Sequence, residues 1–161
     1  KGKVIYQKSF GNHTYESSQK VSNLDVYDIA SLTKIVATLP NVMQEFDKGH
    51  LTLETKLKSM LPMAKNSNKE NATVLDMLTH QARFQPWIPF YKATLDSLNR
   101  PNSQFYRSEF SDEFPIHVAD KLYLRKDYND SIVKTILDSE LLPKKQYKYS
   151  DFSFILFKEY L

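Results

Sequence analysis

The sequence predicts an α+β fold, in which a β-hairpin near the start is followed by a mostly helical region. Three observations support this prediction. Residues 3–10 mix β-branched and aromatic side chains, a composition typical of strands. Residues 32–46 repeat apolar side chains at helical spacing, which predicts an amphipathic helix. Shorter apolar segments that stop at prolines predict further helices in the rest of the chain.

The hairpin is expected within residues 3–16. Gly11 and Asn12 form a turn signal between the strand at 3–10 and a possible return strand at 13–16. Residues 17–25 are polar and are expected to form a loop before the first helix.

The clearest predicted helix begins at Asp28 as its N-cap, or a residue or two later, and stops at Gly49. On a wheel of about 100° per residue, its apolar side chains fall in one arc, which we expect to face a core. Pro40 lies inside this helix and should kink it or free a carbonyl group from its amide partner. The arc consists of Leu32, Ile35, Val36, Leu39, Val42, Met43 and Phe46.

The remaining elements are shorter. Leucines recur over residues 51–62, a polar loop follows at 64–71, and a short helix is expected at 73–80. Residues 84–98 should pass from loop into helix near Lys92, whereas residues 99–129 show no regular pattern. A helix is expected at 132–142, before Pro143, then a loop or extended segment at 144–150 and a last helix from Asp151.

Length and composition exclude several classes of protein. The chain has 161 residues, 41% of them hydrophobic and 25% charged, which fits about one soluble globular domain. It has no cysteine, which excludes disulfides, thiolate metal sites and a cysteine nucleophile. Its three scattered glycines exclude a P-loop and a dinucleotide-binding glycine motif. No apolar run approaches the roughly 18 residues of a membrane span.

Charge and histidine spacing predict neither nucleic-acid nor metal binding. Lys144, Lys145 and Lys148 alternate with Tyr147 and Tyr149, a pattern that could hold a phosphate backbone or a stacked base. A solvated loop is the more common reading, and a net charge of +3 is mild for a nucleic-acid binder. The four histidines lie far apart in the sequence, so we expect them to be surface or hydrogen-bonded residues. We expect no cofactor and no metal.

The sharpest chemical signal is Ser-x-x-Lys. A serine and a lysine three residues apart on a helix share a face, and a lysine with a lowered pKa can take the proton of the serine. The pattern begins at Ser17, Ser31 and Ser131. Ser17 lies in a polar loop, and Ser131 starts a predicted helix, so its spacing does not exclude it. Ser31 lies in the first turn of the clearest helix, where the helix N-terminus favours negative charge. It is the preferred nucleophile of the three, and the alternative is that Lys34 is a solvated lysine on the polar face of the helix.

Several segments around Ser31 also carry a family pattern. The order and spacing of these segments resemble the β-lactamase-related serine hydrolases, which include class C β-lactamases, penicillin-binding proteins, D-alanyl-D-alanine peptidases and related esterases. Tyr-Ser-Asp at 149–151 resembles the second motif of this family, Tyr-x-Asn. The other matching segments are 3–11, Tyr-Asp-Ile-Ala-Ser-Leu-Thr-Lys at 27–34 with Thr38, Phe-Asp-Lys-Gly-His-Leu-Thr-Leu at 46–53, 56–62, and Thr-Val-Leu-Asp-Met-Leu-Thr-His at 73–80.

The resemblance implies a role for four residues. Ser31 would be the nucleophile, and Lys34 would help to remove its proton. Tyr149 would be a second acid/base group that relays a proton to the leaving group. Asp151 would occupy the asparagine position that normally touches the substrate or Lys34. An acid in contact with Lys34 favours the charged ammonium, which makes the lysine a worse base.

Two further departures from the family pattern have consequences. Arg83 stands where the family has a glycine, and it could narrow the cleft, charge it or point to solvent. The third motif, Lys/His-x-Gly on a strand beside the site, is absent from the 161 residues. That strand normally supplies one oxyanion donor, whose loss costs about 10²–10³ in rate. The chain alone is therefore expected to be weakly active or inactive.

In the fold, the resemblance implies a β-lactamase/transpeptidase-like domain that is partial over residues 1–161 and ends before the third motif. It would contain the early hairpin and the mostly helical subdomain but lack most of the antiparallel sheet. We therefore expect it to expose apolar surface that the sheet normally covers, unless a partner hides it.

In function, the resemblance implies a serine hydrolase that forms an acyl-enzyme at Ser31 in the full-length protein. The substrate would be a D-alanyl peptide of cell-wall origin, another small peptidoglycan-derived molecule, a β-lactam or a small ester. The location would be periplasmic or extracellular, and the partners would be the missing half of the domain or a fused glycoside hydrolase. The alternative is a non-catalytic binding or accessory module, which Asp151 and Arg83 favour.

Overall fold

The computed structural model describes residues 2–161, and the chain divides into two units, Lys1–Thr33 and Lys34–Leu161. In the first unit, a bridge between Asn12 and Lys20 closes a loop after Gly11. The hairpin predicted within residues 3–16 is wrong, because residues 3–10 pair with no strand in the described part of the chain. A strand needs a neighbour for its amide and carbonyl groups, and β-forming side chains do not replace one.

The helix predicted from Asp28 forms in three consecutive pieces. Asp28 Oδ1 accepts a hydrogen bond from Ala30 N at 2.7 Å, just where the 3₁₀ turn η1 (Ala30–Leu32) begins. The π-helix η2 (Lys34–Thr38) follows, and then the α-helix α1 (Leu39–Asp47). Pro40 has no amide hydrogen to give to the carbonyl one turn earlier, so the expected disturbance is confirmed as a wider helical turn.

The predicted stop at Gly49 is confirmed. Gly49 has a φ of +74°, a conformation that glycine adopts without a steric penalty. Gly49 N donates to Phe46 O at 2.9 Å, and His50 N donates to Glu45 O at 3.0 Å. These two bonds form a Schellman motif, which satisfies carbonyl groups in the last turn of α1.

The helices of the second unit largely follow the predicted segments. Thr73 caps α3, as its Oγ1 accepts from Asp76 N at 3.1 Å. The last helix begins after Asp151, as predicted, whereas the helix expected at 132–142 starts and ends earlier. No helix within residues 2–161 has the length and apolar character needed to cross a membrane. The elements are α2 (Leu57–Met60), η3 (Pro62–Ala64), α3 (Val74–Leu78), η4 (Phe90–Thr94), α4 (Tyr128–Asp138) and α5 (Phe152–Tyr160).

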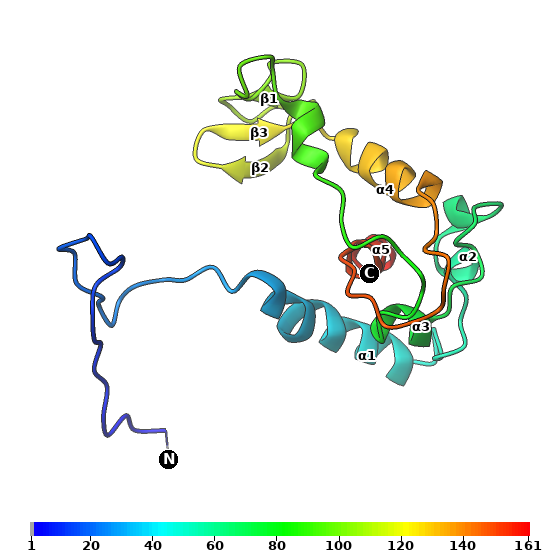
Figure 1. Ribbon diagram of the computed structural model, residues 1–161, viewed down its shortest axis with the longest axis horizontal. Coiled ribbons are helices and arrows are strands. Elements are labelled where there is room, and N and C mark those ends of the chain that lie inside the picture. The colour runs from blue at the N-terminus through cyan, green and yellow to red at the C-terminus, as the bar shows by residue number, and fades with distance from the viewer. Residues whose placement is uncertain (1) are drawn as a thin grey trace. The chain divides into compact units, whose positions relative to one another are not determined.

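The irregular stretch at 99–129 contains a small antiparallel sheet that the sequence pattern did not predict. Its strands are β1 (Tyr106–Arg107), β2 (Ile116–Ala119) and β3 (Leu122–Leu124), in the order β1-β3-β2. Figure 1 shows the sheet near the start of α4. Strands of two to four residues are too short for an alternating pattern to stand out. With the helices, this sheet gives the expected α+β fold without most of the family's sheet.

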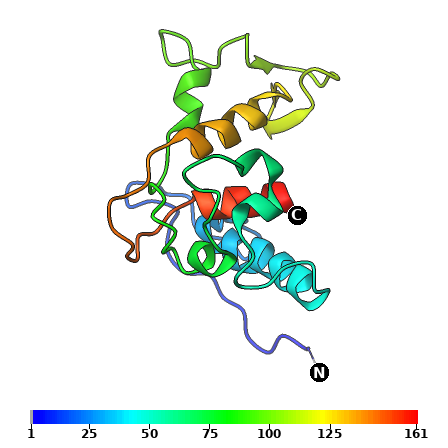
Figure 2. The ribbon, with the colours of Figure 1, turned by 90° about the vertical axis from the view of Figure 1, so that its right-hand side faces the viewer.

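The core of the second unit surrounds α5. This helix contacts η2, α3 and α4, and Figure 2 shows it in red between α4 and α1. Because α5 is apolar on most of its surface, it can pack on several sides at once. The fully buried core residues include Leu57, Val74, Met77, Ile136, Phe152, Leu156 and Phe157.

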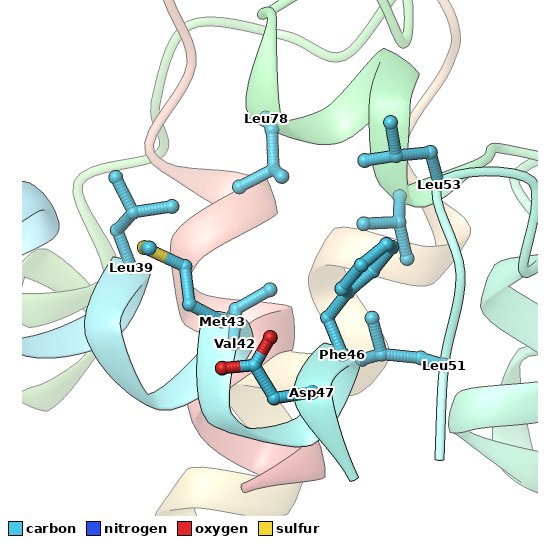
Figure 3. A pocket seen from close by; sticks show the side chains of 9 residues that line it. Leu39, Val42, Met43, Phe46, Asp47, Leu51, Leu53 and Leu78 are labelled. Carbon is cyan, nitrogen blue, oxygen red and sulfur yellow. The ribbon is translucent and has the colours of Figure 1, made fainter. Parts of the chain in front are cut away.

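The apolar face of the helix that contains α1 is largely uncovered. Val42 is buried, but Ile35 is 55% exposed and Met43 is 57% exposed. The prediction that this arc faces a core is therefore wrong for most of its members, whereas the expected exposure of apolar surface is found. Figure 3 shows the groove beside α1, which has a volume of about 290 Å³. It is lined by Leu39, Val42, Met43, Phe46, Asp47, Leu51, Leu53, Val74 and Leu78.

Candidate active site

Two segments that are far apart in the sequence lie side by side and form one wall of the candidate site. Residues 80–86 follow α3, and residues 140–151, which we call the strap, lead from α4 to α5. Leu142 N donates to Arg83 O at 2.7 Å, and Lys148 N donates to His80 O at 2.9 Å. Asp151 N donates to Pro86 O at 2.9 Å. These bonds fix the strap at both ends.

Arg83 anchors the strap. Its Nε donates to Leu142 O at 2.6 Å, so the two residues exchange a pair of hydrogen bonds. Arg83 has a φ of +63°, a conformation that the family glycine would adopt without strain. The half-buried arginine thus keeps the left-handed backbone and adds a side-chain contact to the strap.

Ser150 fixes the turn that precedes α5. It is 1% exposed, and its Oγ donates to Gln85 O at 2.6 Å. The same oxygen accepts from Phe152 N at 3.2 Å in the first turn of the helix. Because Ser150 is held on both sides, its neighbours Tyr149 and Asp151 have defined positions.

Lys34 lies against these neighbours. Its Nζ is 2.7 Å from Asp151 Oδ1, and its side chain is 15% exposed. The ammonium lies 5.1 Å from the ring centroid of Tyr149 and 5.8 Å from that of Phe154, which are cation–π distances. The structure therefore brings together three of the four residues that the sequence predicted for the site.

The surroundings keep Lys34 charged. Burial lowers the pKa of a lysine, but hydrogen bonds and charge interactions with Asp151 and Tyr149 outweigh it here, so the pKa of Lys34 is raised. At neutral pH the lysine is an ammonium that lies between a carboxylate and a phenol.

His80 completes the cluster. Its ring centroid is 4.6 Å from that of Tyr149, and its Nδ1 accepts from Ser150 N at 3.2 Å. Burial, and then the charge of Lys34, lower the pKa of His80. The sequence pattern gave no sign that His80 belongs to the site, because this contact joins residues 70 positions apart.

Ser31 lies in the first unit, three residues before Lys34 in the chain. It is exposed and is part of the turn η1. Ala30 before it has a φ of +43°, which is uncommon for a residue with a side chain and occurs more often at functional sites.

The other two Ser-x-x-Lys patterns have ordinary surroundings. The side chain of Lys134 is 74% exposed and pairs with Asp138 at 2.6 Å, one turn along α4. Ser17 lies in a loop, where its Oγ accepts from Gln19 N at 3.0 Å. Burial and contact with an acid and a tyrosine therefore distinguish Lys34 from the other lysine of a helical pattern.

Comparison with protein families identifies a related family. The model of the family described as Beta-lactamase matches residues 1–161. No match was found among curated proteins or among solved structures.

Proposed function

The chain belongs to the beta-lactamase family, and from this we propose that the full-length protein forms an acyl-enzyme at Ser31. At the family level it is a serine hydrolase of the penicillin-recognising type. The observation that supports the catalytic proposal most strongly is the Lys34 ammonium, which lies between Asp151 and Tyr149 three residues after the serine.

The proposed acylation divides the work among these residues. The Ser31 oxygen forms a bond to the carbonyl carbon of the substrate, and the bond from that carbon to the leaving group breaks. Lys34 is already protonated, so it cannot accept the serine proton while its contact with Asp151 persists. The Tyr149 oxygen takes the serine proton while its own hydroxyl proton passes to the leaving group, and the ammonium stabilises the negative charge that develops on this oxygen. Water then hydrolyses the ester and restores Ser31.

The substrate classes in this proposal are D-alanyl peptides, β-lactams and small esters, all of which react by acyl transfer. We place the protein in the periplasm or outside the cell, in keeping with the family resemblance. Residues 1–161 would be one part of the catalytic domain, and the rest of the domain would supply the third motif.

The second candidate function is a non-catalytic binding module. The contact between Asp151 and Lys34 favours it, because a lysine held as an ammonium is not a base. This candidate predicts that the full-length protein binds a muropeptide without turning it over.

Asp151→Asn tests the proposal through a gain of activity. Without the carboxylate, the pKa of Lys34 falls, so the lysine can more readily accept the serine proton itself. The ammonium form also acts more strongly on Tyr149, so removal of the serine proton by Tyr149 becomes easier. We expect the acylation rate at pH 7 to rise above that of the wild type. The measurement is turnover of a D-alanyl-D-alanine peptide, a β-lactam and a small ester by the full-length protein.

Asp138→Asn is the matched control, because it removes the acid from an exposed Lys–Asp pair on α4 that includes no residue of the candidate site. It should leave the turnover rates unchanged. An Asp151→Asn rate equal to or below that of the wild type would contradict the restraint that we assign to Asp151. Muropeptide binding without turnover in both proteins would establish the binding module instead.

A further inference from the structure

We propose that His80 is a positioning residue for the candidate site, whose neutral imidazole holds the turn from Tyr149 to Asp151 in place and releases it when protonated. Only the expected effect of His80 on acylation rests on the proposed function. The contacts that carry it lie within the second unit.

His80 contacts the strap at three places. Its carbonyl oxygen accepts from Lys148 N at 2.9 Å, and its Nδ1 accepts from Ser150 N at 3.2 Å. The imidazole ring packs against the ring of Tyr149, which lies between these two residues, with 4.6 Å between the ring centroids. One residue therefore fixes three consecutive residues of the strap.

The backbone of His80 is fixed from the other side. His80 N donates to Met77 O at 3.3 Å at the end of α3, and Met77 is fully buried. His80 has a φ of +56°, which histidine and asparagine adopt more readily than most residues. The position of the imidazole is thus fixed by α3 and the core. Through its contacts, the imidazole in turn fixes the position of the strap.

The contact with Ser150 requires a neutral ring. When Nδ1 accepts a hydrogen bond, the proton of the neutral imidazole is on Nε2. Protonation would place a second N–H group opposite the Ser150 amide, and two donors cannot bond to each other. It would also add a positive charge beside the Lys34 ammonium.

Two charged groups around His80 act in opposite directions. Burial and the Lys34 charge on η2 lower the pKa of His80, whereas the Asp151 charge and the bond from Ser150 raise it. The lowering effects are larger, so the ring is neutral at pH 7. On α3, Asp76 is paired with Lys145 at 2.6 Å. The other side chains that face the ring are Tyr147, Tyr149 and Phe154.

Two variants separate the acceptor from the ring. His80→Asn keeps a side-chain acceptor and tolerates the left-handed backbone, whereas His80→Phe keeps an aromatic ring and has no acceptor. In the full-length wild type, acylation should lose rate as the pH falls through a pKa below 6.5. His80→Asn should retain most of the rate at pH 8 and lose this acid limb. His80→Phe should lose about tenfold at pH 8, roughly the value of one hydrogen bond. Equal rates and unchanged acid limbs in both variants would overturn the inference.

A measurement that needs no turnover distinguishes this inference from the proposed function. In the full-length protein labelled with ¹⁵N at serine and histidine, the Ser150 amide resonance should shift with the titration of His80. A Ser150 amide that ignores this titration overturns the inference, whatever the activity. A Ser150 amide that responds, in a protein that never forms an acyl-enzyme, supports the positioning contact and rejects the hydrolase function.

Discussion

Replacement of Lys34 by methionine is expected to slow acylation by the full-length protein about 10²–10³-fold, the usual cost of removing one group that stabilises negative charge developing in the transition state. Methionine keeps the length of the side chain beside Tyr149 and Phe154 but removes the positive charge that stabilises the developing charge on the Tyr149 oxygen. The measurement is the rate of labelling by a fluorescent penicillin or a fluorophosphonate at pH 7, with the melting temperature as a check on folding.

Lys134→Met is the matched control, because Lys134 belongs to the same Ser-x-x-Lys pattern on a helix but its side chain is mostly exposed. It should label at the wild-type rate. A folded Lys34→Met protein that labels as fast as the control would show that Lys34 has no part in acylation.

The second large effect concerns Lys69, a lysine in a predicted polar loop that is 1% exposed. Its Nζ donates to Asn68 Oδ1 at 2.8 Å and to Leu137 O at 3.3 Å, and it also contacts Ser139 O. Leu137 and Ser139 lie at the C-terminal end of α4, where carbonyl groups lack helical partners. The buried ammonium of Lys69 therefore donates hydrogen bonds to carbonyl groups at the C-terminal end of α4.

Burial lowers the pKa of Lys69 from 10.5 to about 8, against the opposing charge of Asp138. In the unfolded chain the lysine keeps its ordinary pKa, so between pH 8 and 10.5 the unfolded state binds more protons than the folded state. The contribution of Lys69 to the free energy of unfolding therefore rises as the pH increases across that window. The full shift corresponds to about 3 kcal/mol.

Comparison with Lys69→Met isolates this effect, because the other titrating groups are common to both proteins. The free energy of unfolding of the wild type should rise relative to Lys69→Met by up to about 3 kcal/mol between pH 8 and 10.5. Urea unfolding at several pH values measures the difference. The difference between the wild type and Lys134→Met, which replaces a mostly exposed lysine, should show no such rise. If the free energy of unfolding changes with pH in the same way in the wild type and in Lys69→Met, the claim that Lys69 is a buried charge is contradicted.

The elements that the sequence predicted well depend on contacts within a few residues. Gly49 ends α1 through bonds to the preceding turn, and Thr73 caps α3 through the amide three residues later. Pro40 disturbs its helix because it lacks one hydrogen atom. Such signals can be read from neighbouring residues, without knowledge of the rest of the fold.

The features that sequence reasoning missed depend on distant contacts. The burial of Lys69 requires the end of α4, about 70 residues later in the chain. The position of His80 in the site depends on its contact with Ser150, which lies 70 positions later in the sequence. The pairing of Lys34 with Asp151 was anticipated only through the family resemblance, because no periodic pattern links residues so far apart.

The account rests most directly on Ser31 as the nucleophile. The test is residue-level mass spectrometry of the full-length protein after incubation with a fluorophosphonate or a fluorescent penicillin, beside Ser31→Ala. We predict one covalent adduct on Ser31 in the wild type and none in the variant. An adduct that persists in Ser31→Ala would contradict the assignment.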